Sequence, residues 1–164
     1  MLVRPARRED AAAIADVHVQ TWQAAYAHIF GADRLAGLGD RRRTQWEDWL
    51  GDPKPDWRIF VAEEDGRLVG FAWVGDSRAE PGKGELLAIY VLPGAWGSGA
   101  GSALMTSALD ALRGYSSATL WVLEDNPRAR RFYEREGWLL DGGRQEEEFL
   151  GVTVPEVRYR ITFD

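Results

Sequence analysis

Residues 84–105 read GELLAIYVLPGAWGSGAGSALM, and this stretch decides the fold of the chain. An apolar run over 85–92 is typical of a strand near the middle of a sheet. A turn at 93–94 and a loop with glycines at 97, 99 and 101 then lead into an amphipathic helix. Because the free amides of such a loop and of a helix start point into one concavity, the pattern favours a phosphate site. The plainer alternative is a strand, a flexible turn and a helix with no ligand.

The composition is that of an ordinary globular domain. With 164 residues, 45% of them hydrophobic and 28% charged, the chain is expected to form a single domain over 1–164. It contains no cysteine, which excludes disulfides, thiolate zinc sites and cysteine nucleophiles. Its only histidines are His18 and His28, so we expect no metal site.

The charge and the hydropathy pattern bear on the partners and the location. A net charge of −6 argues against nucleic-acid binding, whose affinity depends on neutralising phosphates, and is compatible with a cationic acceptor. No apolar run reaches the ~18 residues that cross a membrane. The start, MLVRPARRED, lacks the apolar core of a signal peptide. We therefore expect a cytoplasmic protein with no nucleic-acid and no membrane partner.

Upstream of the glycine loop, the pattern predicts a strand, several helices and a hairpin. Asp65-Gly66 is a strong hairpin signal between two apolar runs. The predicted elements are a strand over 2–6, helical segments from residue 9 with a joint around 31–39, a helix over 41–50, and strands over 58–64 and 68–74.

Downstream of the loop, helices and strands alternate and then end in a hairpin. Asn126 is a good N-cap, Pro127 suits the first helical position, and Gly137 suits a left-handed C-terminal cap. The predicted elements are a helix over 99–112, strands over 118–123, 138–149 and 154–163, and a helix from Asn126 to Gly137. The fold class is therefore one mixed α/β (α+β) domain.

This order of elements resembles the GCN5-related N-acetyltransferase (GNAT) superfamily over essentially the whole chain. The most specific parts are Tyr90–Met105 and Leu120–Trp138, the second of which reads LWVLEDNPRARRFYEREGW. The resemblance implies a mixed, mostly antiparallel central sheet flanked by helices, with splayed central strands. It also implies acetyl-CoA as the acyl donor and an amine as the acceptor.

In that family the glycine loop binds the pyrophosphate of acetyl-CoA. The resemblance assigns this role to Trp96, Gly97, Ser98, Gly99, Ala100, Gly101 and Ser102. Relatives carry Arg or Gln at the position of Trp96, so we expect binding here to depend on backbone amides. A dinucleotide fingerprint does not fit, because Leu104 stands where it needs a small residue, and a Walker loop would need a lysine that is absent.

The resemblance also places the pantetheine arm of the cofactor beside the strand before the loop. Ile89, Tyr90 and Val91 are the matching positions, and the arm pairs with their backbone as an added strand would. Asn126 contacts the same arm while it caps its helix. The alternative is that these are ordinary central strands with every ladder bond made.

Direct acetyl transfer needs a base for the attacking amine and an acid for the departing thiolate, but no protein nucleophile. Tyr133 stands where the family commonly has its general acid. Glu85 stands where some members have a base that acts directly or through one water. The alternatives are a packing tyrosine with a bonded hydroxyl, and a strand-end glutamate that faces solvent.

The acceptor is expected to be a primary amine on a small molecule or a peptide. We expect Trp22, Tyr26, Trp121 and Glu124 at its pocket, because aromatic faces attract cations, although core packing is the alternative for the aromatic residues. Two other functions stay open: a non-catalytic acyl-CoA sensor of the same fold, and a protein N-terminal or lysine acetyltransferase. A homodimer stays open too, because similar proteins commonly dimerise.

Overall fold

One seven-stranded sheet, in the order β1-β2-β3-β4-β5-β7-β6, organises the computed structural model, which describes residues 1–164. Every neighbouring pair is antiparallel except β4 and β5, which are parallel. The strands are β1 (Leu2–Pro5), β2 (Arg58–Glu64), β3 (Arg67–Asp76), β4 (Gly84–Val91), β5 (Ser117–Leu123), β6 (Leu139–Phe149) and β7 (Val152–Thr162). The helices are α1 (Ala11–Phe30), α2 (Ala32–Ala36), α3 (Leu38–Gly51), α4 (Ala100–Leu112) and α5 (Pro127–Arg135), with 3-10 turns η1 (Arg8–Asp10) and η2 (Pro93–Ala95). The expected mixed, mostly antiparallel fold is confirmed.

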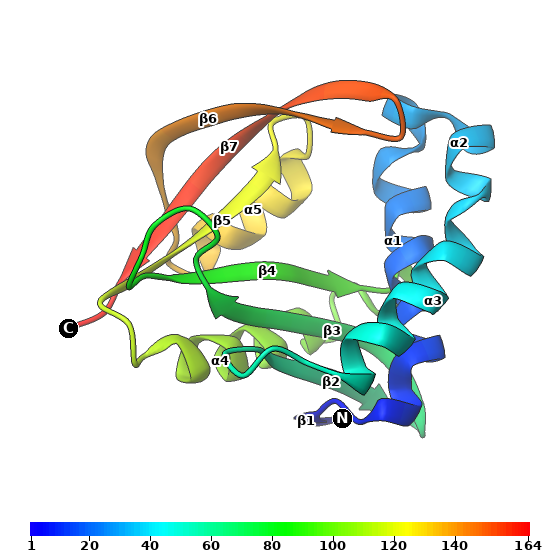
Figure 1. The fold of residues 1–164 in the computed structure, drawn as a ribbon, viewed down its shortest axis with the longest axis horizontal. Coiled ribbons are helices and arrows are strands. Elements are labelled where there is room, and N and C mark those ends of the chain that lie inside the picture. The colour runs from blue at the N-terminus through cyan, green and yellow to red at the C-terminus, as the bar shows by residue number, and fades with distance from the viewer.

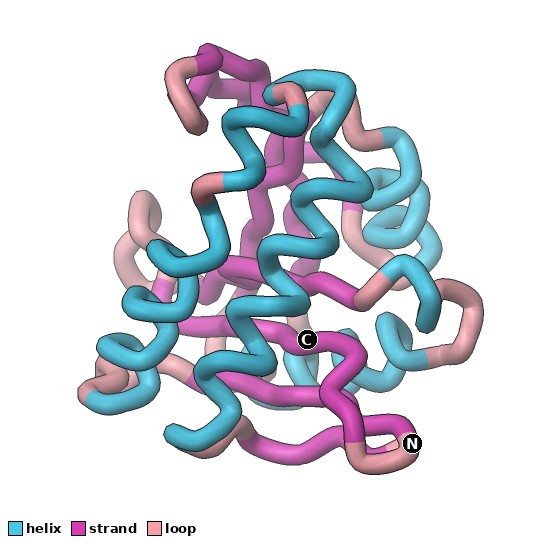
Figure 2. Tube along the Cα trace, turned by 90° about the vertical axis from the view of Figure 1, so that its right-hand side faces the viewer, coloured by secondary structure: helices cyan, strands magenta, loops and turns pink.

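Helices cover both faces of the first half of the sheet (Figure 1). α1 and α3 lie side by side over one face, and in Figure 2 they stand in front of the strands. α4 packs against β2, β3 and β4 from the opposite face. Alternate residues of β3 pack on opposite faces of the sheet: Phe71 packs with α1, whereas Ala72 and Val74 pack with α4.

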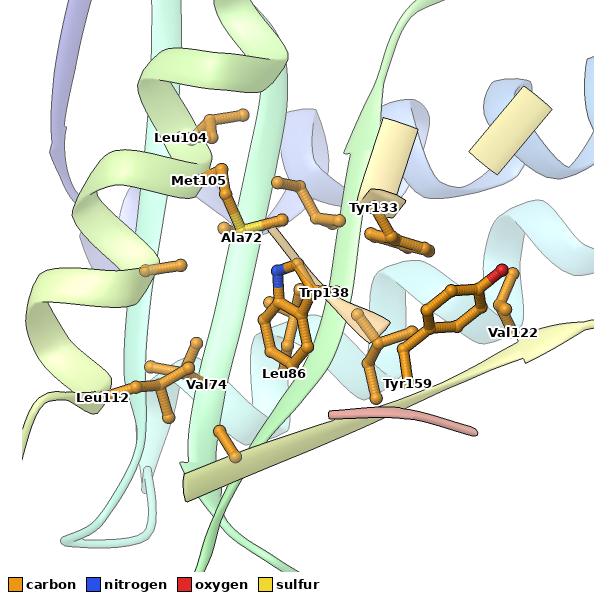
Figure 3. Close-up of a cluster of buried hydrophobic side chains, with 14 of the residues drawn as sticks. Ala72, Val74, Leu86, Leu104, Met105, Leu112, Val122, Tyr133, Trp138 and Tyr159 are labelled. Carbon is orange, nitrogen blue, oxygen red and sulfur yellow. The ribbon is translucent and has the colours of Figure 1, made fainter. Parts of the chain in front are cut away.

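α4 buries most of its apolar stripe against the sheet. Leu104 and Leu112 have no exposed surface and belong to one cluster with Trp138 (Figure 3). Gly70 on β3 keeps the helix close, because a Cβ there would lie 2.8 Å from the Tyr90 carbonyl oxygen and 3.0 Å from Leu104 Cδ1. The start of α4 is therefore held at a fixed position relative to the end of β4.

The tryptophan-rich first half of the chain forms a second core between the sheet and α3. Trp46 is completely buried and contacts Trp49 and Trp73 edge-to-face, with ring centroids 5.2 and 5.4 Å away. Trp46 also donates its Nε1–H to Nδ1 of His18 at 3.2 Å. Burial lowers the pKa of His18 to about 3, so this histidine is a neutral core residue.

The two central strands part soon after they meet. β4 and β5 pair only at Gly84–Ala118 and Glu85–Thr119, near the start of both strands. Figure 1 shows them meeting at one end and diverging from there. β5 instead pairs along its whole length with β7. The expected splay is confirmed, and it leaves the second half of β4 without a partner on the β5 side.

Some element boundaries differ from those expected. α3 begins at Leu38 and runs through Gly39, where an interruption was predicted. Leu38 is buried, and burial of this side chain outweighs the low helix propensity of the two glycines beside it. The joint between the first two helices is Gly31, with a φ of +79°. No helix is long and apolar enough to cross a membrane.

Candidate active site

A cavity of about 1350 Å³ opens where β4 and β5 part. Its walls come from β4, β5, α1, α5 and the glycine loop, with further residues from β6 and β7. Typical small-molecule pockets measure roughly 300–1000 Å³. The cavity is therefore large enough for an extended cofactor together with a second ligand.

Four backbone N–H groups of the glycine loop have no hydrogen-bond partner within the protein. They belong to Gly97, Gly99, Gly101 and Ser102, and all four residues line the cavity. Gly99 has a φ of +92°, a left-handed conformation that turns the loop into α4 and suits glycine. Free donors at a helix N-terminus attract phosphate, because the helix dipole adds positive potential there.

The two intervening loop residues use their amides internally. The N–H of Ser98 donates to the carbonyl of Ala95 at 3.2 Å, and the N–H of Ala100 donates to Ser98 Oγ at 3.3 Å. Neither Ser98 nor Ala100 lines the cavity. Of the segment expected to bind the pyrophosphate, Trp96, Gly97, Gly99, Gly101 and Ser102 are therefore the residues that the structure brings to the cavity.

Trp96 is held between the end of β4 and the start of α5. Its Nε1–H donates to the Val91 carbonyl at 2.9 Å, and the guanidinium carbon of Arg128 lies 3.3 Å from its ring centroid. Arg128, Arg131 and Arg135 all line the cavity, and none of them forms an ion pair. Burial and then the charges of Arg135 and Arg131 lower the pKa of Arg128. Unpaired positive charge therefore lies beside the free amides.

Asn126 links α5 to α1. Its Oδ1 accepts from the N–H of Ala129 at 3.2 Å, which is the expected N-cap bond. Its Nδ2 donates to the hydroxyl of Tyr26 at 3.0 Å. One side chain thus fixes both the start of α5 and an aromatic wall of the cavity.

Tyr133 lies on α5 and faces the cavity. Its side chain belongs to the buried cluster in Figure 3, and the residue is only 8% exposed. Its hydroxyl makes no hydrogen bond, and burial raises the pKa of the phenol well above its usual range, with a further contribution from Tyr90. A phenol that stays protonated and has no partner is suited to donate a proton to a ligand.

Glu85 lies at the start of β4 and is 2% exposed, so the solvent-facing alternative is wrong. The backbone N–H of Arg78 donates to Oε1 at 3.0 Å, and the Arg78 guanidinium bonds both carboxylate oxygens. Glu85 does line the cavity, as expected of a base. Both of its oxygens are nevertheless occupied by Arg78.

The expected acceptor residues divide into two groups. Trp22, Tyr26 and Trp121 line the cavity, and the first two are also buried among other aromatic rings. Glu124 does not line it, and its carboxylate pairs with Arg144 at 3.2 Å. The structure therefore does not bring Glu124 to the cavity, although its backbone N–H still donates to the Pro155 carbonyl of β7 at 3.0 Å and both of its neighbours, Leu123 and Asp125, line the cavity.

Five polar residues that line the cavity were not predicted as site residues from the sequence. They lie on α3, on the loop between β3 and β4, on β6 and on β7, and they are Arg42, Arg78, Gln145, Glu147 and Glu156. The alternation of β6 and β7 carries some of the signal, because Gln145 pairs with Glu156 and Glu147 lies on the same side as Gln145. Nothing local to the sequence shows which face of these strands looks into the cavity.

Comparisons with known proteins agree with this geometry. The model of the acetyltransferase (GNAT) family matches residues 16–138. The uncharacterized N-acetyltransferase YuaI of Bacillus subtilis is 38% identical over 131 residues, which are 76% of this chain and 73% of the relative. A mycothiol acetyltransferase of Streptomyces avermitilis is 40% identical over 119 residues, which are 70% of this chain but only 36% of that protein.

Solved structures share the fold at low sequence identity. PaiA N-acetyltransferase of Thermoplasma acidophilum, in complex with coenzyme A, has a TM-score of 0.79 at 18% identity over 99% of this chain and 98% of that one. The yncA structure of Salmonella typhimurium, with acetyl-CoA, has a TM-score of 0.75 at 23% identity over 100% of this chain and 94% of that one. The match to the family model covers most of the chain, and it spans the glycine loop, Asn126 and Tyr133. The chain is an N-acetyltransferase and belongs to the acetyltransferase (GNAT) family.

Proposed function

We propose that this protein transfers the acetyl group of acetyl-CoA to a primary amine by direct attack. The observation that carries the proposal is a set of four unpaired loop amides on residues that line a cavity between splayed strands. A diphosphate needs several converging donors, and a thioester arm needs an open strand edge. Both features occur side by side, and the related folds of PaiA and yncA were solved with coenzyme A and acetyl-CoA respectively.

The donor half of the cavity fits the polar end of acetyl-CoA. The amides of Gly97, Gly99, Gly101 and Ser102 are the proposed donors to the pyrophosphate. Arg128 supplies the positive side chain that relatives carry at the position of Trp96, because its guanidinium stacks on that ring. The pantetheine arm is proposed to lie along Ile89, Tyr90 and Val91, which line the cavity where β4 has no β5 partner.

The chemical step uses Tyr133 as the acid. As the nitrogen–carbon bond forms and the carbon–sulfur bond breaks, the Tyr133 hydroxyl donates its proton to the departing sulfur. Its unpaired hydroxyl and buried position suit this role. Glu85 is the candidate base from the sequence, and it accepts a proton, directly or through water, only after Arg78 releases one of its oxygens.

The acceptor is proposed to be an amine on a small molecule or a peptide. The cavity that Tyr133 lines is also lined by the aromatic rings of Trp22, Trp121 and Phe149 and by carboxylates. Aromatic faces and carboxylates together favour an ammonium group. An acyl-CoA sensor would have no use for an unpaired buried phenol, so the enzymatic function is the one that the site supports best.

Calorimetry and a thiol-release assay test the proposal. We expect acetyl-CoA to bind, and dephosphorylated pantetheine fragments without the pyrophosphate to bind at least about 10-fold more weakly. We then expect CoA release with at least one compound from a panel of alkylamines, diamines, amino acid amides and lysine-containing peptides. No binding of acetyl-CoA would overturn the function, whereas binding without turnover on any amine would favour the sensor. Turnover confined to the peptides would identify a protein acetyltransferase.

A further inference from the structure

Glu156 on β7 is a cavity carboxylate to which the proposed reaction has given no role. It lines the cavity and is 8% exposed. Its Oε1 accepts from Gln145 Nε2 at 2.9 Å, and no lysine, arginine or histidine forms an ion pair with it. A buried carboxylate with a single neutral hydrogen bond is poorly stabilised. Its free oxygen, Oε2, therefore favours a proton or a cationic ligand.

The sheet places Glu156 beside the end of β5 that has parted from β4. Glu156 pairs with Leu123 at the end of β5, where that strand has parted from β4. Burial chiefly raises the pKa values of Tyr26 and Tyr90, and the charge of Glu156 raises both further. Tyr90 in turn raises the pKa of Tyr133. Glu156 therefore lies within electrostatic reach of the phenols that surround the proposed acid.

Glu85 and Glu156 differ in how their oxygens are used. Arg78 bonds both oxygens of Glu85 and neutralises its charge at close range. Only Gln145, a neutral amide, bonds Glu156. A carboxylate whose two oxygens are both bonded by a guanidinium offers no free oxygen to a ligand unless that contact breaks. Glu156 has no ion pair that must break before its free oxygen can accept a proton.

The surroundings also make Glu156 a stronger base than an ordinary glutamate. Burial raises its pKa, while the hydrogen bond from Gln145 lowers it. Glu147 and Glu85 raise it further, and Arg78 lowers it. General bases work best when their pKa approaches the working pH. The groups that set this pKa come from β6, from β4 and from the loop that carries Arg78.

We infer that Glu156, not Glu85, receives the proton of the acceptor ammonium. This inference rests on the proposed acetyl transfer. One proton moves from the ammonium to Glu156 Oε2, directly or through a water, and leaves a neutral amine. The amine attacks the thioester carbon, the carbon–sulfur bond breaks, and Tyr133 protonates the sulfur. The second nitrogen proton, lost as the amide forms, restores the phenol, and Glu156 releases its proton to solvent.

The dependence of kcat/KM on pH tests the inference with the full-length protein, saturating acetyl-CoA and the best amine of the panel. Wild type is expected to show an acid limb, because Glu156 must be ionised before it accepts a proton. Glu156→Gln is expected to lose that limb and about 100-fold of kcat/KM at neutral pH, with recovery at high pH where the free amine is already neutral. Glu85→Gln is expected to keep the limb.

Two further variants separate proton transfer from folding and from simple charge attraction. Gln145→Ala removes the hydrogen bond that lowers the pKa of Glu156, so the limb should move to higher pH while the base remains. Glu147→Gln, the matched control, removes a cavity-lining carboxylate that is exposed and forms no ion pair. Because Glu147 raises the pKa of Glu156, the limb should persist in this variant and move to lower pH, opposite to the shift in Gln145→Ala.

The possible results test the role of Glu156 separately from the proposed acetyltransferase function. A wild type that acetylates no amine overturns both. An active wild type whose acid limb survives Glu156→Gln, or disappears in Glu85→Gln, overturns the role of Glu156 and leaves the acetyltransferase function intact. If Glu156→Gln fails to fold, an unshifted limb in Gln145→Ala overturns the inference on its own.

Discussion

The guanidinium carbon of Arg128 lies 3.3 Å from the centroid of the Trp96 ring, so a residue of α5 is stacked on a residue of the glycine loop. The Trp96 Nε1–H is at the same time bonded to the Val91 carbonyl. The ring therefore fixes a positive charge beside the four free amides of the loop. We propose that this contact substitutes for the charged or polar side chain that the loop itself lacks.

Removing the charge or its support should weaken acetyl-CoA binding. Arg128→Ala and Trp96→Ala are each expected to raise the Kd by about 5- to 20-fold, since a charge-assisted contact at a partly exposed site contributes roughly 1–2 kcal/mol. Trp96→Phe keeps a ring under the guanidinium and should stay within about 3-fold of wild type. Calorimetry measures all three, with Arg43→Ala, an exposed arginine outside the cavity, as the control.

The double variant tests whether Trp96 acts through Arg128. If it does, Trp96→Ala with Arg128→Ala should bind no more weakly than Arg128→Ala alone, because the two changes remove one interaction. Additive losses would contradict the stacked arrangement. A pantetheine thioester without phosphates should bind equally to all of these variants.

Tyr133→Phe should abolish most turnover without harming the fold. We expect kcat to fall by about 100-fold, the usual contribution of a positioned acid, while the Kd for acetyl-CoA is unchanged. The melting temperature should also be unchanged, because the Tyr133 hydroxyl has no hydrogen-bond partner to leave unsatisfied. Thiol release and thermal unfolding measure the two effects.

Tyr159→Phe is the matched control for Tyr133→Phe. The Tyr159 hydroxyl donates to Glu134 at 2.8 Å and accepts from Arg130 Nε at 3.1 Å, in the same buried cluster. Its loss should cost about 1–3 kcal/mol of unfolding free energy and leave kcat within about 3-fold of wild type. The two tyrosines should thus show opposite patterns, and full activity of Tyr133→Phe would remove it as the acid.

A left-handed glycine should be essential to the phosphate loop. Gly99→Ala is expected to lower the unfolding free energy by about 1 kcal/mol, because a Cβ is unfavourable at its φ of +92°, and to weaken acetyl-CoA binding as the loop relaxes. Gly94→Ala serves as the control, because that glycine has an ordinary φ and no atom within 4 Å of an added Cβ. Denaturant unfolding and calorimetry should separate the pair, and equal behaviour would contradict the argument.

The sequence was most informative where backbone geometry is dictated locally. Glycines at alternate loop positions predicted a turn with free amides, and Asn126-Pro127 predicted a capped helix start; both lie at the cavity. The splay of β4 from β5 followed from the resemblance. Within the loop, however, the pattern did not separate the cavity-lining Gly97 and Gly99 from Ser98, whose amide is bonded inside the turn.

Contacts between distant segments could not be read from the chain. Glu85 was expected to be a free base or a solvated charge, and only the folded loop brings Arg78 onto both of its oxygens. Glu156 lies in a strand of ordinary alternating pattern. Only the folded structure shows that it is buried and that it lines the cavity between β4 and β5. Side-chain roles that depend on tertiary approach are therefore visible only in the structure.

Acid should destabilise the protein through His18, which is buried and accepts a hydrogen bond from Trp46. Burial lowers its folded-state pKa to about 3, so the unfolded chain, with an ordinary histidine pKa, binds the proton first as the pH falls. The contribution of His18 to the free energy of unfolding is therefore fully present above the histidine pKa of the unfolded chain, and it is lost as the pH falls below that value. Between about pH 7 and pH 5 this group alone should cost about 2 kcal/mol.

His18→Gln is the variant that isolates this effect. The glutamine stays neutral over the same range and keeps an oxygen that accepts from Trp46. We expect denaturant unfolding to show a shallower loss of stability for His18→Gln than for wild type between about pH 7 and pH 5. Because the other titrating groups are common to both proteins, parallel curves would mean that His18 takes up its proton without unfolding.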